Sequence, residues 1–189
     1  MGMYTEFIFG CTLSKKTPKQ CIDALDYVIN GEEEKERVDF IGRKTSITRT
    51  TSIKEIEDFI DKYELYSFVS AGGSYYFGAH TTSGYFGYDQ CSDSYVIATR
   101  SNCKNYQGQI EKFIEYITPF VRSGSGYEHN IFAYVQYEEA PFPTLYGKDG
   151  KFTVMDTQTE KELINKENAR WRLINNLLSY AAPYYYITE

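Results

Sequence analysis

The stretch from Tyr63 to Tyr106 constrains the fold of this chain more than any other feature. The chain has 19 tyrosines in 189 residues, and eight of them fall in this stretch among glycines and serines. Aromatic and β-branched residues favour strands, whereas Gly-Gly, Ser-Gly and Asp-Gln-Cys-Ser are typical of turns. The pattern therefore predicts a meander of short antiparallel strands at 66–70, 74–79, 84–88 and 95–100.

Tyrosine at this density is also typical of binding surfaces. Its ring offers a large contact area for little loss of side-chain freedom, and its hydroxyl can stay at a wet rim. The candidate binding tyrosines of the meander are Tyr75, Tyr76, Tyr85 and Tyr88.

Three helices are predicted from apolar residues spaced three and four apart. The helix at 18–30 follows a possible capping box at Thr17, with Pro18 at its first position. The helix at 52–62 starts at a second capping box, Ser52-Ile53-Lys54-Glu55. The helix from about Asn105 to Val121 contains Pro119, which should kink or end it.

Further strands are predicted on both sides of these helices. The segment 4–13 contains the apolar run Phe7-Ile8-Phe9. The segment 131–137 is the clearest strand, because Ile131, Ala133 and Val135 alternate with Phe132, Tyr134 and Gln136. Two prolines precede 144–146, so we expect an edge strand there, followed by a turn and a strand at 151–155.

The order of these elements predicts the fold class α+β. Helices interrupt the strands too irregularly for a doubly wound parallel sheet, so we expect a mainly antiparallel sheet of five or more strands. Its helices should pack on one face, with a further C-terminal helix. The predicted core residues are Phe7, Phe9, Ile22, Leu25, Val28, Ile56, Phe59, Ile60, Phe113, Ile117, Ile131, Ala133 and Val135.

We expect an α+β domain at 1–156 and a C-terminal helix with an aromatic tail at 157–189. Residues 159–182 carry a helical apolar seam of Ile164, Trp171, Ile174, Leu178 and Ala181. Leu163, Leu173 and Leu177 widen the apolar surface. The helix therefore either closes the core of its own chain or forms a homodimer interface in which Trp171 and Leu177 take part.

Charge and cysteine usage favour a cytoplasmic protein that does not bind nucleic acid. The formal charge is −6, and Lys15, Lys16 and Lys19 are the nearest approach to a basic cluster. The four cysteines form no Cys-x-x-Cys pair, so we expect reduced thiols and no zinc site. The N-terminus lacks the order of a secretory signal, and its apolar run is too short to span a bilayer.

No catalytic, cofactor or metal motif emerges from the residues. Nothing in the spacing joins His80 or His129 to a nucleophile, and the motif Gly-x-Ser-x-Gly is absent. The neighbours Glu138 and Glu139 should point to opposite faces of a strand. Arg100 and Lys104 lie where a strand leads into a helix, a place where anions bind. The alternative is that Arg100 forms an ion pair with Glu138 or Asp93. We therefore predict no catalytic residue, no cofactor and no metal ligand.

Three segments resemble small uncharacterised proteins of bacteria and their phages. They are Tyr4-Thr5-Glu6-Phe7-Ile8-Phe9-Gly10-Cys11, Arg100-Ser101-Asn102-Cys103-Lys104-Asn105-Tyr106, and Tyr137-Glu138-Glu139 followed by Pro143-Thr144-Leu145-Tyr146. The resemblance covers about residues 3–146 and implies a setting, the cytoplasm of a bacterium or of a phage-infected host. It implies no activity.

The leading functional hypothesis is a non-enzymatic protein-binding module, specifically a phage-encoded inhibitor of a bacterial defence system, with a bacterial or phage protein as partner. An immunity protein that neutralises a toxin belongs to the same class. The alternatives are a module that sequesters a small ligand or nucleotide between tyrosines, and an enzyme acting on a phosphorylated small molecule near Arg100 and Lys104.

Overall fold

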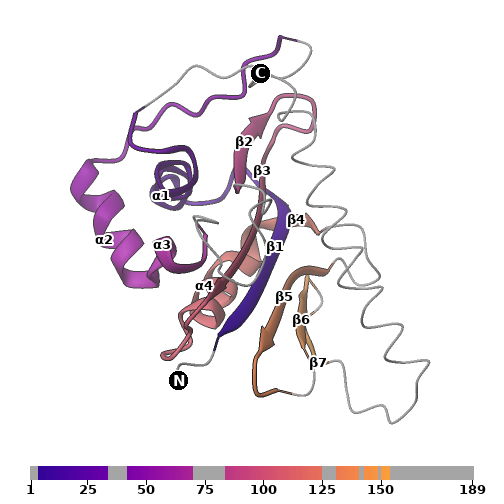
Figure 1. Cartoon of the computed structure of the whole chain (residues 1–189). Coiled ribbons are helices and arrows are strands. Elements are labelled where there is room, and N and C mark those ends of the chain that lie inside the picture. The colour runs from indigo at the N-terminus through magenta and orange to yellow at the C-terminus, as the bar shows by residue number, and fades with distance from the viewer. Residues whose placement is uncertain are drawn as a thin grey trace.

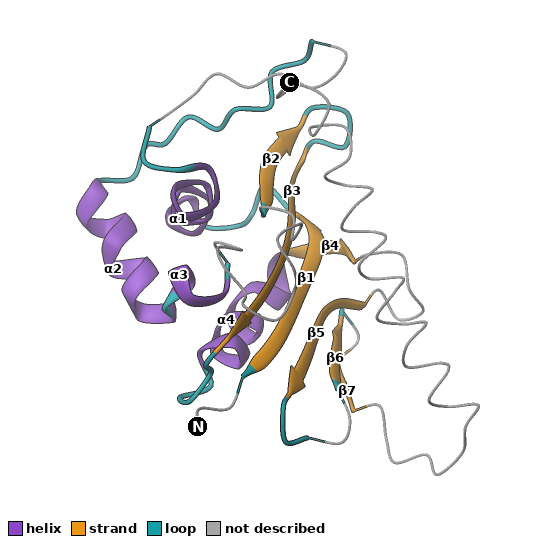
Figure 2. Ribbon diagram, in the orientation of Figure 1, coloured by secondary structure: helices purple, strands orange, loops and turns teal. Residues whose placement is uncertain are grey.

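The computed structural model describes residues 4–33, 42–69, 84–124, 131–140, 143–148 and 150–153. Their strands form one antiparallel sheet, and Figures 1 and 2 show the described helices on one side of it. The strands are β1 (Thr5–Leu13), β2 (Tyr85–Asp89), β3 (Ser94–Cys103), β4 (Val121–Gly124), β5 (Ile131–Tyr137), β6 (Thr144–Gly147) and β7 (Gly150–Thr153). The helices are α1 (Lys19–Asn30), α2 (Ile53–Tyr63), α3 (Leu65–Phe68), α4 (Gln109–Ile117) and the 3-10 helix η1 (Thr118–Phe120).

Strand β1 is the centre of the sheet. The strand order is β2-β3-β1-β5-β6-β7, and β4 also pairs with β1. Strand β3 covers one edge of β1 along its whole length, from Thr5↔Cys103 to Leu13↔Tyr95. On the other edge, β5 pairs with the first half of β1 and β4 with its end. The prediction of an α+β fold with an antiparallel sheet of five or more strands is confirmed.

The two faces of β1 have different surroundings. Phe7, Phe9, Cys11 and Leu13 belong to the core that the sheet forms with the helices. Because side chains alternate along a strand, Ile8 and its even-numbered neighbours point to the second face.

The predicted core is confirmed, since all thirteen of its residues are buried. Phe113 of α4 lies at its centre. Its ring centroid is 5.8 Å from that of Phe9, 5.7 Å from Phe68 and 6.0 Å from Tyr63. The core therefore joins β1 to α2, α3 and α4 through a chain of aromatic rings.

One of the two predicted capping boxes forms. At α2 the Ser52 side chain accepts from the Glu55 N–H, and the Glu55 carboxylate accepts from the Ser52 N–H. At α1 the capping box is wrong, because Pro18 occupies the N-cap position and Thr17 Oγ1 donates to the Ser14 carbonyl at 2.7 Å. The helix begins one residue later than the motif requires.

The expected strand at 66–70 is wrong over the residues described. Glu64 adopts a left-handed conformation with φ 51°, which ends α2, and the chain then turns helically again in α3. Leu65 and Phe68 are both buried, and a spacing of three places both on the core side of a helical turn.

The helix expected at 105–121 is shorter. Helix α4 starts only after Gly108, whose φ of 69° is left-handed, and the chain continues as η1 from Thr118. Pro119 lies in η1, and Val121 already belongs to β4. Proline therefore ends the α-helix, as its missing N–H requires.

Strand β6 is not an edge strand, which corrects the expectation for 144–146. It pairs with β5 on one side and with β7 on the other, where the register runs from Gly147↔Gly150 to Thr144↔Thr153. Of the meander, β2 and β3 form as adjacent strands, whereas 74–79 lies outside the described residues.

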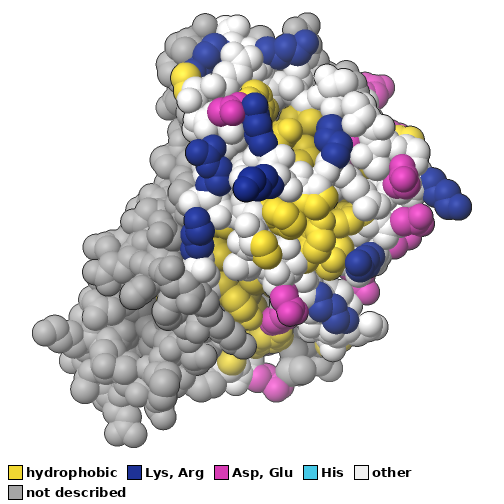
Figure 3. Space-filling model, turned by 180° about the vertical axis from the view of Figure 1, so that it is seen from behind, with side chains coloured by type: hydrophobic (Ala, Val, Ile, Leu, Met, Phe, Trp, Pro, Cys, Tyr) yellow, Lys and Arg dark blue, Asp and Glu magenta, His cyan; other side chains and the backbone are white. Residues whose placement is uncertain are grey.

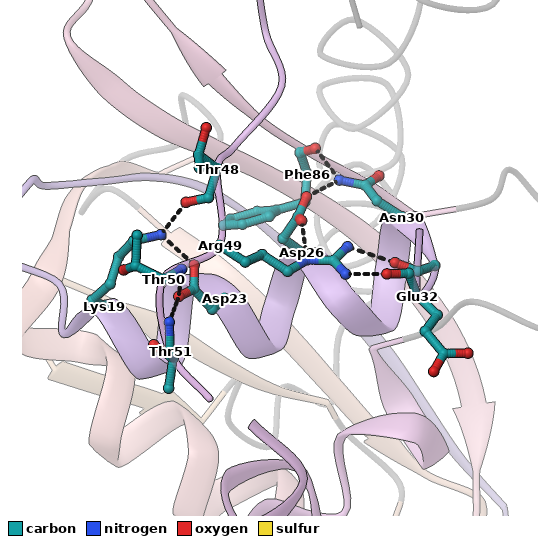
Figure 4. A network of polar contacts seen from close by, with 11 residues as sticks. Lys19, Asp23, Asp26, Asn30, Glu32, Thr48, Arg49, Thr50, Thr51 and Phe86 are labelled. Atoms are coloured by element: carbon teal, nitrogen blue, oxygen red, sulfur yellow. Dashed lines mark hydrogen bonds and ion pairs between the residues drawn. The ribbon is translucent and has the colours of Figure 1, made fainter. Parts of the chain in front are cut away.

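A buried polar network ties the segment 42–51 to α1 (Figure 4). Asp26 accepts from Arg49 Nε at 2.6 Å, and both side chains are almost fully buried. Arg49 also donates to the carbonyls of Gly31 and Glu32 beyond the end of α1. Breaking such a pair leaves an uncompensated buried charge, so the network fixes the path of a segment without regular structure.

Asp23 makes the second part of this network. Its carboxylate accepts from the Thr50 N–H at 3.0 Å, from the Thr51 N–H at 2.9 Å and from Lys19 Nζ. Burial by itself would raise the pKa of Asp23, but these hydrogen bonds outweigh it and lower the pKa below its ordinary value.

The free energy of unfolding should depend on pH through Asp23. Because the folded-state pKa is lowered, the carboxylate stabilises the fold above its unfolded pKa of about 3.9, and this stabilisation is lost as the pH falls through the folded value. We expect Asp23→Asn to destabilise the protein at pH 7, with a difference from the native chain that shrinks below about pH 4. Urea unfolding across this pH range measures it, with Glu57→Gln on the exposed face of α2 as control. A difference that stays constant with pH contradicts the assignment.

Truncation of the central core ring should be costly. Phe113 has no exposed surface, so Phe113→Ala should lower the free energy of unfolding by roughly 3–5 kcal/mol. Ile53→Ala on the exposed start of α2 should change it by less than about 0.5 kcal/mol. Denaturant titration of both variants provides the comparison. Similar losses of unfolding free energy for the two would show that Phe113 is not a core residue.

Candidate binding surface

The hairpin formed by β2 and β3 brings two tyrosines together at one end of the sheet. Tyr88 and Tyr95 are cross-strand partners whose ring centroids lie 5.4 Å apart. The turn between them includes Asp93 in a left-handed conformation, φ 51°. The Tyr88 hydroxyl donates to Asp93 Oδ1, so the turn and the ring hold each other in place.

Two cations attach to this hairpin from other parts of the chain. Lys15 Nζ lies 2.6 Å from Asp93 Oδ1 and 5.9 Å from the centroid of the Tyr88 ring. Arg122 donates to the Ser92 carbonyl at 2.9 Å. The hydrogen bond from Lys15 lowers the pKa of Asp93, and that from Tyr88 contributes in the same direction. The hydrogen bond to Asp93 is the largest cause that raises the pKa of Tyr88.

A second aromatic group lies on α4 and η1. Tyr116 and Phe120 are both half-buried, with ring centroids 5.8 Å apart. The ring of Tyr116 also packs against two buried rings, with centroid separations of 5.4 Å from Phe59 and 5.2 Å from Tyr63. Burial is the main cause that raises the pKa of Tyr116 to about 12, so its hydroxyl stays neutral at physiological pH.

The end of β1 lies between the two aromatic groups. Leu13 is the cross-strand partner of both Tyr95 and Val121, and the Ser14 N–H donates to the Phe120 carbonyl at 2.9 Å. Tyr95 on β3 and Val121 on β4, the residue after Phe120, are therefore two strand spacings apart, which is about 10 Å. We call this set the tyrosine surface: Lys15, Tyr88, Asp93, Tyr95, Tyr116, Phe120 and Arg122. Figure 3 shows hydrophobic side chains gathered on the rear face of the molecule, with Lys and Arg side chains around them.

The binding residues predicted from the sequence lie in different parts of the molecule. Tyr88 lies in the tyrosine surface, but Tyr85 pairs with Ala98 and points to the second face of the sheet. Arg100 is five residues beyond Tyr95 on β3, so it and Lys104 lie toward the opposite end of the strand. Tyr75, Tyr76, Trp171 and Leu177 are outside the described residues.

Arg100 is engaged with Glu6 on the neighbouring strand. Its Nη2 lies 3.0 Å from Glu6 Oε1, and both side chains are mostly buried. The expected partners Glu138 and Asp93 are wrong, because Glu138 accepts from the Tyr4 N–H at 3.0 Å and Asp93 lies at the hairpin turn. The guanidinium is therefore neutralised within the sheet.

The junction between β3 and α4 is built around Asn105. Asn105 Oδ1 accepts from the Ile110 N–H at 3.2 Å, which satisfies an amide at the start of α4. Its Nδ2 donates to Glu111 Oε2 and to the Tyr137 hydroxyl, both at 2.7 Å. Lys104 remains exposed between two tyrosine rings, 5.8 Å from the centroid of Tyr4 and 6.0 Å from that of Tyr106. The helix N-terminus that suggested an anion site thus already has an internal acceptor.

The described residues include no group of three His, Cys, Asp or Glu side chains that could hold a metal ion. All four cysteines are free thiols. Three are buried, and burial is the main cause that raises the pKa of Cys103 to about 11. Cys91 is exposed within the hairpin turn, where Arg43 donates to its Sγ.

Among the helices of the described ranges, none is long and apolar enough to cross a membrane. Comparisons of the chain with protein-family models, with curated proteins and with solved structures give no match.

Sequence reasoning missed most of the tyrosine surface. Tyr88 and Tyr95 are placed symmetrically about the turn at 90–93, so the sequence of the hairpin already indicates their pairing. Lys15 and Arg122 are distant in sequence, and no local pattern connects them to Asp93. Tyr116 and Phe120 both fall in the single helix predicted from about Asn105 to Val121, whereas the structure divides this stretch between α4 and η1.

The fold should tolerate loss of the Lys15 side chain from the tyrosine surface. Lys15 and Asp93 are both more than half exposed, and exposed ion pairs contribute little to stability. We expect Lys15→Ala to lower the free energy of unfolding by less than about 1 kcal/mol. Thermal and urea unfolding check this. A larger loss would show that Lys15 holds the hairpin in the fold and is not a residue available for binding.

Proposed function

We propose that the protein is a non-enzymatic protein-binding module and that the tyrosine surface contacts the partner. The observation that carries the proposal is the grouping of partly exposed aromatic rings with exposed charged side chains at one end of the sheet. Aromatic residues and arginine are enriched in protein interfaces and provide most of their binding energy.

The arrangement of the rings favours a protein partner over a small ligand. Tyr88 and Tyr95 pack against each other at an angle of 57°, and Tyr116 and Phe120 do the same. Rings packed in this way leave no parallel slot between them for a flat ligand. They instead present a broad apolar area with polar tips, which matches the anatomy of an interface core and rim.

The charges of this surface add specificity. Lys15 and Asp93 are exposed and paired, and Arg122 lies beside the same turn. Exposed charges at the rim of an interface change the rate of encounter and its dependence on salt more than they change affinity. A partner should therefore bind faster at low ionic strength.

The narrower form of the proposal is a phage-encoded inhibitor of a bacterial defence system. It rests on the resemblance of three segments to small proteins of bacteria and their phages, together with the small size and acidity of the chain. An immunity protein that neutralises a toxin would use the same kind of surface.

Capture from a bacterial lysate tests the proposal. The intact chain, a variant with Tyr88→Ala and Phe120→Ser, and Tyr106→Ala are immobilised in parallel. Tyr106 is the matched control because it is an exposed tyrosine beyond the opposite end of β3. Loss of an interface anchor costs about 2 kcal/mol or more, so the double variant should recover the partner at least about tenfold less well.

A stoichiometric protein lost by the double variant and kept by Tyr106→Ala supports the proposal, provided that circular dichroism shows both variants folded. Recovery of a nucleotide without a protein overturns it in favour of ligand sequestration. A protein lost only by Tyr106→Ala places the interface at the other end of the sheet. If the partner belongs to no defence system, the narrower form is overturned and the broader one stands.

A further inference from the structure

Strand β2 ends the strand order of the sheet, and its own sequence does not protect this edge. Natural edge strands are commonly kept from pairing with other chains by lysine, proline or a bulge. The strand Tyr85–Asp89 contains neither lysine nor proline, and it pairs with β3 without a bulge. Its one charged side chain, Asp89, accepts from the N–H groups of Cys91 and Ser92 in the following turn. Protection of the edge must therefore come from elsewhere in the chain.

Two other parts of the chain bond to the outer edge of β2. The Tyr88 N–H donates to the Thr45 carbonyl at 3.1 Å. The Phe86 carbonyl accepts from Asn30 Nδ2 at 2.9 Å, at the end of α1 (Figure 4). Backbone groups of an antiparallel strand point alternately to its two sides, so residues 86 and 88 are the ones that face away from β3. The segment 42–51 and the end of α1 thus lie where an added strand would pair.

Buried contacts hold the segment 42–51 in this position. Thr45 and Ile47 are both buried. Arg49 forms its buried ion pair with Asp26, and Asp23 accepts from the next two backbone N–H groups. The segment contains no strand of its own, so it covers β2 without presenting a new row of unpaired backbone groups.

We propose that the segment 42–51 is an edge guard that keeps β2 from pairing with β2 of a second copy. Two copies of one strand can pair antiparallel about a two-fold axis, because each then offers the other the same backbone groups. Three of the five residues of β2 are aromatic, and aromatic cross-strand pairs stabilise a sheet. The guard acts on backbone groups of β2, so the inference does not rest on the proposed function of the tyrosine surface.

Removal of the buried ion pair tests the inference. The double variant Asp26→Leu/Arg49→Met loses both charges together, so no lone buried charge is left to unfold the chain. Loss of these charge-assisted hydrogen bonds should make amide exchange at Tyr88 at least about tenfold faster at low protein concentration. Hydrogen exchange followed by mass spectrometry measures this. As the concentration rises, sedimentation should show a dimer, and exchange at Tyr88 should slow again because β2 is then paired.

Two further variants complete the comparison. Lys19→Ala removes a donor to the Thr48 carbonyl but leaves the buried pair intact, so it should accelerate exchange at Tyr88 by a smaller factor. It provides the same test if the double variant does not fold. The matched control is Glu6→Leu/Arg100→Met, which removes another mostly buried ion pair between β1 and β3. This control should leave exchange at Tyr88 and sedimentation unchanged.

Four outcomes overturn the inference. Unchanged exchange at Tyr88 in every variant of the segment that circular dichroism shows to be folded means that these contacts do not hold the guard in place. Faster exchange in a chain that stays monomeric at all concentrations means that an uncovered edge does not pair. A dimer in which exchange at Tyr88 stays fast places the contact between copies elsewhere. Equal dimerisation of the control assigns self-association to another surface.

Discussion

The fold depends on β1, a strand that has partners on both edges. Strand β3 pairs with all nine of its residues on one side, and β5 and β4 share the other side. Its backbone groups are thereby satisfied without water, which buried N–H and C=O groups require. Because both edges are occupied, β1 can be almost entirely buried without offering a free edge for aggregation. The helices pack on the face of the sheet at whose centre Phe7, Phe9 and Leu13 of β1 lie.

The polar network around α1 has a different role from the aromatic core. The core determines that α1, α2 and α4 lie on the sheet, but apolar contacts are not directional. Hydrogen bonds from Arg49, Thr50 and Thr51 to Asp26 and Asp23 fix one particular path for the segment between α1 and α2. Asn30 extends the network to the sheet, because its Nδ2 donates to the Phe86 carbonyl of β2 at 2.9 Å. Helix α1 is therefore attached to both the segment and the sheet through directional contacts.

Most of the fold could be predicted from local patterns, but the tyrosine surface could not. The α2 helix follows directly from the spacing of Ile56, Phe59, Ile60 and Tyr63 and from the capping box at Ser52. The segment after it was assigned to the wrong class, since aromatic residues such as Tyr66 and Phe68 favour strands and a single buried turn is too short to show periodicity. For the surface, Tyr88 was anticipated from composition, whereas Lys15 and Arg122 reach the hairpin only through the pairing of β1 with β3 and β4. Contacts of this kind are a property of the topology and leave no trace in a local window.

The central position of β1 has a consequence for synthesis of the chain. The ribosome makes β1 well before its neighbours, since β3 begins at Ser94 and β5 at Ile131. A chain that emerges at about 5–20 residues per second leaves β1 without either neighbour for several seconds. During this time its apolar run is exposed with two open edges, the state from which strands associate with other chains. Helices α1 and α2 are complete much earlier and carry the apolar faces that later cover β1. Besides their place in the finished core, these two helices are able to shield the strand on which the sheet is built before β3 and β5 have been made.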